Sequence, residues 1–182
     1  AGTYNADNSG WTADFALTPA MVEGPIRVVS CYSNDGNTNN VDYWFAPVTF
    51  NHNYAQLTAV DYNDGQITIK GYHAADAAYG EPNHFLILFD DTTNQQVAAV
   101  KTSAATTPAQ AQGLVAYNAA KSGFSASLSV PNGLNSGHQY SFVLRYSADA
   151  HDNGNNGAHT DCWLTLNRAN AAHLDGINFS NG

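Results

Sequence analysis

The sequence predicts an all-β chain with an Ig-like antiparallel β-sandwich repeat unit and part of a preceding unit in front of it. Two observations support this prediction. Short runs that alternate apolar and polar side chains are separated by turn signals, which is typical of strands in a sandwich. The first part of the chain also resembles a later part, which is typical of a repeat protein.

The repeat consists of three blocks that keep the same order. Residues 4–17 align with residues 117–130, and residues 26–33 align with residues 140–147. The two copies then share an Asp-x-Trp pattern, in which Asp42 and Trp44 align with Asp161 and Trp163. A weaker match also joins residues 55–65 to residues 172–182.

These matches divide the chain into three parts. Residues 1–50 are predicted to be the C-terminal half of a preceding β-sandwich repeat, 51–167 a complete seven-stranded repeat, and 168–182 the first strand of a following repeat. We therefore expect a fragment of a tandem array.

The strands of the complete unit are predicted in order. LTAVDY and QITIKGY flank the turn Asn63-Asp64-Gly65, and HFLILFD and QQVAAVKT flank DDTTN, so each pair is expected to form a hairpin. HFLILFD is apolar on both faces, which indicates a central strand. The Ala- and Gln-rich segment TTPAQAQGLVAYNAAKSG is predicted to be a crossover loop. FSASLSV, QYSFVLRYS and HTDCWLTL then complete the seven strands.

The half-unit contains counterparts of only the last three strands. Three strands with one apolar face are marginal by themselves. They could pack on the complete unit, pair with another copy or be the remnant of a lost domain, and the sequence leaves these alternatives open.

Composition excludes two classes of partner. The chain has 6 Lys and Arg residues against 15 Asp and Glu residues, a formal net charge of −9. Nucleic-acid binding depends on clustered cations, so we expect no nucleic-acid partner. No apolar run approaches the roughly 20 residues of a spanning helix, so no membrane span is expected.

The two cysteines occupy different places in the two copies. Cys31 and Tyr43 are predicted to be cross-strand neighbours, and Arg145 and Cys162 take the same two places. A Cys31–Cys162 disulfide would therefore join equivalent hairpins of successive units. The alternative is two separate buried thiols.

The Asn- and Asp-rich loops of the two hairpins offer oxygen ligands of the kind that calcium prefers. The candidate calcium ligands are Asp35, Asn37, Asn39, Asp42, Asp149, Asp152 and Asp161. The alternative is that Asn and Gly are present because they tolerate the backbone conformations of tight turns.

Aromatic side chains beside these polar loops suit a sugar, which presents C–H groups to a ring and hydroxyls to amides and carboxylates. The candidate glycan-binding residues are Tyr32, Tyr43, Trp44, Arg145, Tyr146 and Trp163, with Tyr72 and Tyr79 as a second surface. Strand alternation favours a core position for the tryptophans, and Tyr32 and Tyr146 are expected to be more exposed.

Catalysis is not expected. His73 and His84, with Asp76 and Glu81 nearby, could form an acid/base group, and they would need to share a cleft with a carboxylate. The sequence contains no nucleophile elbow, phosphate-binding glycine loop or His-Glu-x-x-His motif.

The blocks ITIKGYHAADAAYGEPNHFLILFD, VAYNAAKSGFSASLSV and FVLRYSADAHDNGNN, followed by the Asp-x-Trp strand, resemble repeated modules of lactobacillus-type surface proteins and cell-wall lysins. The resemblance implies an extracellular accessory module located at the cell wall or cell surface. The chain departs from those modules at Cys31, where they have Arg, and at Cys162, where they have Tyr. This departure bears on any ligand role that needs those side chains in both copies.

The expected function is that of a non-catalytic tandem-repeat module, part of a larger surface protein or lysin, that binds bacterial cell-wall or other surface glycan. Its expected partners are that glycan and neighbouring repeats of the same chain. The alternative is a structural stalk or adhesin repeat without a glycan ligand.

Overall fold

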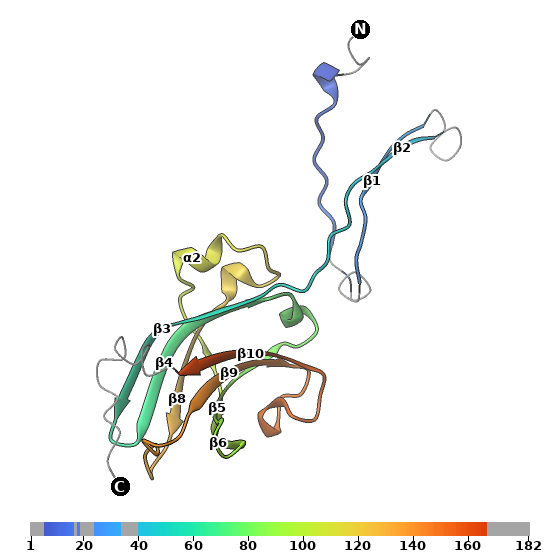
Figure 1. The fold of residues 1–182 in the computed structure, drawn as a ribbon. Helices are drawn as coiled ribbons and strands as arrows, with labels where there is room; N and C mark the ends of the chain where they lie inside the picture. Colours follow the sequence, from blue (N-terminus) through green and yellow to red (C-terminus); the bar gives the residue numbers. More distant parts are fainter. Residues whose placement is uncertain (1–5, 17, 19–23, 34–39, 167–182) are drawn as a thin grey trace. The chain divides into compact units, whose positions relative to one another are not determined.

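The computed structural model describes residues 6–16, 18, 24–33 and 40–166 and divides the chain into two compact units (Figure 1). Unit 1 is Ala1–Val48 and unit 2 is Thr49–Gly182. The described residues are nearly all strand, turn and loop, and every strand pairing is antiparallel. The prediction of an all-β antiparallel sandwich is confirmed.

Unit 2 contains two four-stranded sheets. The first has the order β3 (Asn53–Asn63), β4 (Gln66–Ala75), β8 (Gly123–Ser129), β7 (Ser103–Ala104). The second has the order β10 (His159–Leu166), β9 (Tyr140–Ser147), β5 (Asn83–Asp90), β6 (Gln95–Lys101). Lettered in chain order, the strands form ABED and GFCC′ sheets, which is the arrangement of an Ig-like sandwich. The short edge strand β7 is the eighth strand and was not predicted.

The core lies between the two sheets. Ile67 and Ile69 of β4 contribute to it from one sheet, and Leu86, Leu88 and Phe142 contribute from the other. The β3–β4 turn follows the sequence prediction, because Asp64 and Gly65 both adopt positive φ, at 47° and 73°. The apolar run in β5 also has the predicted central position, with β9 on one side and β6 on the other.

The predicted crossover loop connects β7 to β8 and contains the short helix α2 (Ala109–Gln112) and the 3-10 turn η3 (Ala119–Lys121). Two more 3-10 turns, η2 (Asp76–Tyr79) and η4 (Asp152–Gly154), connect β4 to β5 and β9 to β10. Asp76 fastens the crossover loop to the start of β3, because its carboxylate accepts from the backbone N–H of Tyr117 and of His52. Among the described residues, no helix has the length and apolar character that crossing a membrane requires.

Unit 1 contains the 3-10 turn η1 (Ala6–Asn8) and a hairpin of β1 (Val29–Tyr32) and β2 (Val41–Trp44). A single bridge, Ile26 with Val48, extends the hairpin. The strand expected near Trp11 is not formed, since residues 9–16 have no strand assignment. The following-repeat strand predicted at 168–182 lies outside the described residues.

The hairpin registers differ by one residue from the prediction. Cys31 pairs with Asp42, not with Tyr43, and Arg145 pairs with Asp161, not with Cys162. The reason is that a hairpin's pairing is set by its loop, which sequence alignment does not reveal. The shift is the same in both copies, so aligned residues still occupy equivalent pairs.

Candidate functional site

The candidate site lies on the outer face of the sheet β10-β9-β5-β6 in unit 2. Side chains alternate along a strand. Leu86, Leu88, Phe142 and Leu144 point into the core, so their sequence neighbours point away from it. The outer face is therefore defined by β10 residues 161, 163 and 165 and the residues paired with them.

Three cross-strand rows make up this face, and each contains one residue from β10, β9 and β5. The rows are Asp161–Arg145–Phe85, Trp163–Val143–Ile87 and Thr165–Ser141–Phe89. Val143 and Ile87 are buried, so the middle row is an apolar floor beneath the larger side chains. We call these nine residues the outer-face site.

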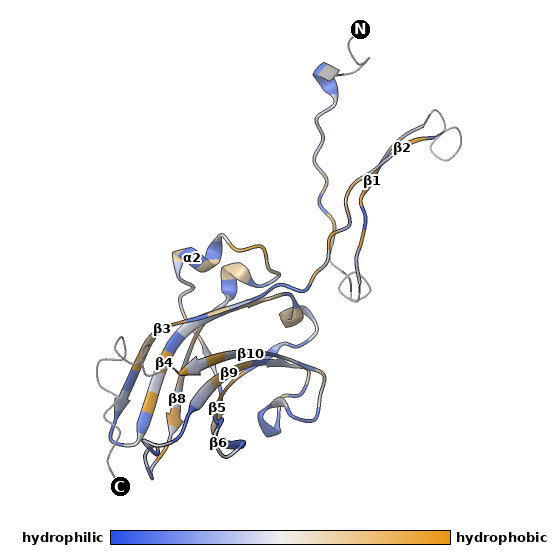
Figure 2. Cartoon of the chain, in the orientation of Figure 1, coloured by the Kyte–Doolittle hydropathy of each residue, from blue (hydrophilic) through white to orange (hydrophobic). Residues whose placement is uncertain are grey.

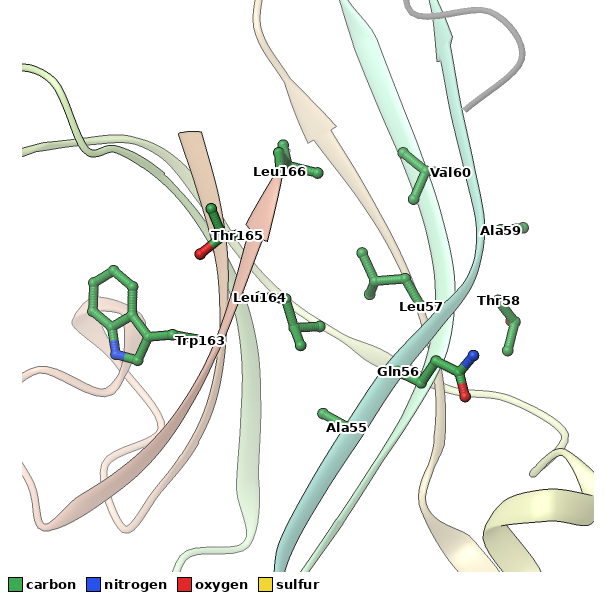
Figure 3. A pocket seen from close by; sticks show the side chains of 10 residues that line it. All are labelled: Ala55, Gln56, Leu57, Thr58, Ala59, Val60, Trp163, Leu164, Thr165 and Leu166. Carbon is green, nitrogen blue, oxygen red and sulfur yellow. The ribbon is translucent and has the colours of Figure 1, made fainter. Parts of the chain in front are cut away.

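Trp163 is the most prominent side chain of the outer-face site, with 51% of its surface exposed. Its ring meets Phe89 edge to face, with ring centroids 5.3 Å apart. Figure 3 shows that Trp163 points away from the groove into which Leu164 projects. The expectation of a core position for Trp163 is wrong, because its place in the alternation puts it on the outer face.

Arg145 and Asp161 form a bidentate ion pair in the neighbouring row. Nε and a terminal nitrogen of Arg145 donate to the two Asp161 carboxylate oxygens at 2.6 and 2.7 Å. The other terminal nitrogen donates to the side-chain oxygen of Asn155. Hydrogen bonding to Asp161 raises the pKa of Arg145. Arg145 is buried and holds Asp161 in place through the ion pair, and its role as a glycan contact stays a prediction.

Tyr146 is also not an exposed surface residue, because only 7% of its surface is accessible. Its hydroxyl donates to the backbone carbonyl of His73 and accepts from the side-chain amide of Asn118. Burial raises the pKa of Tyr146 to about 12. The prediction of exposure is wrong because Tyr146 follows Arg145 in β9 and therefore faces the interior.

The predicted second surface is divided in the structure. Tyr72 is buried in β4, where its hydroxyl lies 3.4 Å from the side-chain oxygen of Gln56. Tyr79 in η2 meets Tyr117 edge to face, with centroids 5.2 Å apart, and Tyr117 is exposed. The Tyr79–Tyr117 pair is therefore a smaller aromatic surface, at the loops joining strands of unit 2.

The three candidate glycan-binding residues of unit 1 are exposed. Tyr32 lies in β1, and Tyr43 and Trp44 lie in β2. Trp44 pairs with Val29 in the same way that Trp163 pairs with Val143. An exposed tryptophan thus occupies the same hairpin position in both copies.

Those predicted calcium ligands that belong to the described residues do not gather around a common point. Asp35, Asn37 and Asn39 lie outside the described residues, and Asp42 is paired with Cys31 in the hairpin. In unit 2, Asp161 is bound to Arg145, while Asp152 accepts from the side-chain amide of Asn156. One Asp149 oxygen accepts from the His151 backbone N–H. Over residues 6–16, 18, 24–33 and 40–166, no group of three or more His, Cys, Asp or Glu residues is arranged to hold a metal.

Cys31 and Cys162 are free thiols in the structure and belong to different units, so the candidate disulfide between them stays a prediction. Cys31 is exposed, and its pKa is raised by a hydrogen bond to Asp42. Cys162 faces the core and is half-buried, and burial raises its pKa. Burial of both thiols, which was the alternative prediction, holds only in part and only for Cys162.

His73 and His84 contact each other rather than a carboxylate. His73 Nδ1 lies 2.9 Å from His84 Nε2, and the remaining ring nitrogens contact Asn53 and Thr102. Asp76, the acidic residue predicted to lie near them, is bound to His52. His84 lines a cavity of about 320 Å³, and none of the described residues lining that cavity is acidic. The shared cleft that an acid/base role required is therefore not formed.

A groove of about 740 Å³ lies in unit 2 between β3 and β10, the edge strands of the two sheets (Figure 3). Leu57, Val60, Leu164 and Leu166 line it, and all four also pack on the core. The groove is therefore the open side of the sandwich, and Gln56, Thr58 and Thr165 also line it.

Sequence reasoning missed Phe89, the partner of Trp163. The apolar run HFLILFD could have indicated it, since a strand with apolar side chains on both faces needs other apolar side chains to pack against on each face. Comparison with protein-family models, with curated proteins and with solved structures found no match to this chain.

Proposed function

We propose that this chain is a non-catalytic extracellular module that binds bacterial cell-wall or other surface glycan through the outer-face site. The observation that carries the proposal is the half-exposed ring of Trp163 standing against Phe89 on a strand face. A rigid aromatic surface of this kind suits the C–H face of a sugar ring. The Asp161 carboxylate in the neighbouring row is a fixed acceptor for sugar hydroxyls.

Charge and rigidity also support the proposal. The formal net charge of −9 favours a neutral or cationic ligand over a polyanion. The ion pair with Arg145 holds Asp161 before a ligand arrives, so little ordering is needed on binding. The same tryptophan position is exposed in unit 1, which suits a repeat protein that binds at more than one place.

The test is sedimentation with purified bacterial cell walls, together with a glycan array, for the unchanged chain and three variants. Trp163→Ala should weaken binding at least fivefold, because truncating an aromatic side chain that anchors a ligand costs more than about 1 kcal/mol. Val115→Ala, an exposed apolar residue away from the site, is the matched control and should bind normally. Tyr117→Ala tests the smaller aromatic surface and should also bind normally.

Two outcomes would reject the outer-face site. If Tyr117→Ala loses binding while Trp163→Ala retains it, the ligand sits at the Tyr79–Tyr117 pair. If the unchanged chain binds neither walls nor any arrayed glycan, the role is that of a stalk or spacer without a glycan ligand.

A further inference from the structure

The hairpin of unit 1 has the same pairing as the β9–β10 hairpin of unit 2. Val29, Ser30, Cys31 and Tyr32 pair with Trp44, Tyr43, Asp42 and Val41. Their aligned counterparts Val143, Leu144, Arg145 and Tyr146 pair with Trp163, Cys162, Asp161 and Thr160. Aligned residues of the two hairpins therefore have aligned cross-strand partners, although most of the side chains differ. The two hairpins are therefore the same structural element in two surroundings.

The surroundings of the two hairpins differ at positions that face the core in unit 2. Tyr146 is 7% exposed, but its counterpart Tyr32 is 56% exposed. Phe45, the counterpart of the core residue Leu164, is also exposed. Tyr32 and Tyr43 thus occupy core positions, and their exposure in unit 1 does not mark them as a ligand surface.

The segment before the hairpin shows the same contrast. Trp11 and Phe15 align with Phe124 and Leu128 of β8. Phe15 is 68% exposed and lies outside any strand, whereas Leu128 is 1% exposed in a strand that pairs with β4. Apolar residues lie along both strands of the hairpin (Figure 2). Trp11 already meets Phe45 edge to face at 5.9 Å, and both of their counterparts belong to the core of unit 2.

Unit 2 shows what covers these positions. Strand β9 is paired along its whole length with β5, and β8 is paired with β4. The described sheet of unit 1 contains only β1 and β2. The strands that flank the equivalent residues in unit 2 come from the first half of the unit, residues 51–116, which precede the aligned region.

We propose that unit 1 is an acceptor for the first half of a repeat of the same kind, a segment with the pattern of residues 51–116. Its β4-like strand pairs with residues 10–16, and its β5-like strand pairs with β1. The covered face contains Tyr32, Tyr43 and Phe45, while Trp44 stays on the outer face like Trp163. This inference is independent of glycan binding, because it concerns the core side of the hairpin.

The test compares the chain with an extended chain in which a second copy of residues 51–116 precedes residue 4. Hydrogen–deuterium exchange of residues 10–16 and 29–32 is measured in both. We expect amide exchange there to slow at least tenfold in the extended chain, while exchange in unit 2 is unchanged. The control carries Leu86→Asp in the added copy only, which places a charge at a core position and should restore fast exchange.

A second arm covers the case in which the extended chain does not fold. Residues 51–116 are then supplied as a separate polypeptide and refolded together with the full chain from urea. Slower exchange at residues 10–16 and 29–32 supports the proposal, and unchanged exchange overturns it. The proposal is also overturned if the chain alone protects these residues as a dimer, detected by light scattering, because the partner is then a second copy.

Discussion

Acid should destabilise unit 2 through His73 and His84, whose rings lie in one chain of hydrogen bonds. Asn53 Oδ1 lies 2.7 Å from His73 Nε2, so that nitrogen carries a proton and His73 Nδ1 accepts from His84 Nε2. His84 Nδ1 then accepts from the Thr102 hydroxyl at 2.8 Å. Each ring is neutral in this arrangement, and an added proton on His73 Nδ1 would place a second donor against the N–H of His84 Nε2.

Burial lowers the pKa of His73 to about 3, and the carboxylate of Asp161 opposes this shift. Burial and then the neighbouring His73 lower the pKa of His84 well below its usual value. An unfolded histidine has a pKa of about 6.5. Below that pH the unfolded chain binds protons that the folded chain does not, so stability is greatest above about pH 6.5 and falls as the pH drops toward 3. For His73 alone, the loss is about 2 kcal/mol at about pH 5 and about 3 kcal/mol at about pH 4.

Urea unfolding followed by tryptophan fluorescence at about pH 7 and about pH 5 measures this loss. His73→Gln should be less stable than the unchanged chain at neutral pH, but should lose about 2 kcal/mol less on acidification. His151→Gln, at an exposed loop position, is the matched control and should keep the full acid loss. If the unchanged chain and His73→Gln lose the same stability between the two pH values, the reasoning is wrong. A His73 ring resonance that titrates near pH 6.5 in NMR spectra would also refute it.

Three further predictions concern single residues of unit 2, each measured by urea unfolding. Arg145→Ala should destabilise the fold by about 3 kcal/mol, because it leaves a partly buried carboxylate without its partner; a loss below about 1 kcal/mol would contradict this. Gly154→Ala should cost about 1–3 kcal/mol, because the glycine has φ +71° and an added Cβ would lie 2.5 Å from Ser147 Cβ. Gly80→Ala, where the added atom meets nothing within 4 Å, should be nearly neutral, and equal losses for both glycines would reject the steric argument. Tyr146→Phe should cost about 1–2 kcal/mol, because it removes the hydrogen bond to the His73 carbonyl and the one from the Asn118 side-chain amide, although that amide still donates to the same carbonyl; an unchanged midpoint would show that the hydroxyl is not needed.

The sequence determined the strands of unit 2 because their signals are local. Alternation identified QITIKGY and FSASLSV, and the Asp64-Gly65 pair identified the turn, since few residues tolerate positive φ. The edge strand β7 was missed because two residues cannot show a period. The strand near Trp11 was predicted but is not formed, because a strand needs a neighbour to pair with, and local pattern does not supply one.

The candidate site was only partly visible in the sequence. Trp163 was identified from its place beside a polar loop, but its exposure was predicted wrongly. Which face of a strand is buried depends on register, and a shift of one residue exchanges the two faces. Tyr146, which was expected to be exposed, is therefore buried, and Trp163, which was expected to be in the core, is exposed. Phe89, which contacts Trp163, belongs to a strand more than seventy residues earlier in the chain.

The sequence by itself determined the type of fold and the alignment of the two copies, because both depend on residue pattern along the chain. The tertiary structure alone decided which aligned residues are core and which are surface. The same hairpin buries Tyr146 in unit 2 and exposes Tyr32 in unit 1. The physical reason is that burial requires atoms from the opposite sheet and the adjoining strand, and these are supplied by residues far from the hairpin in sequence.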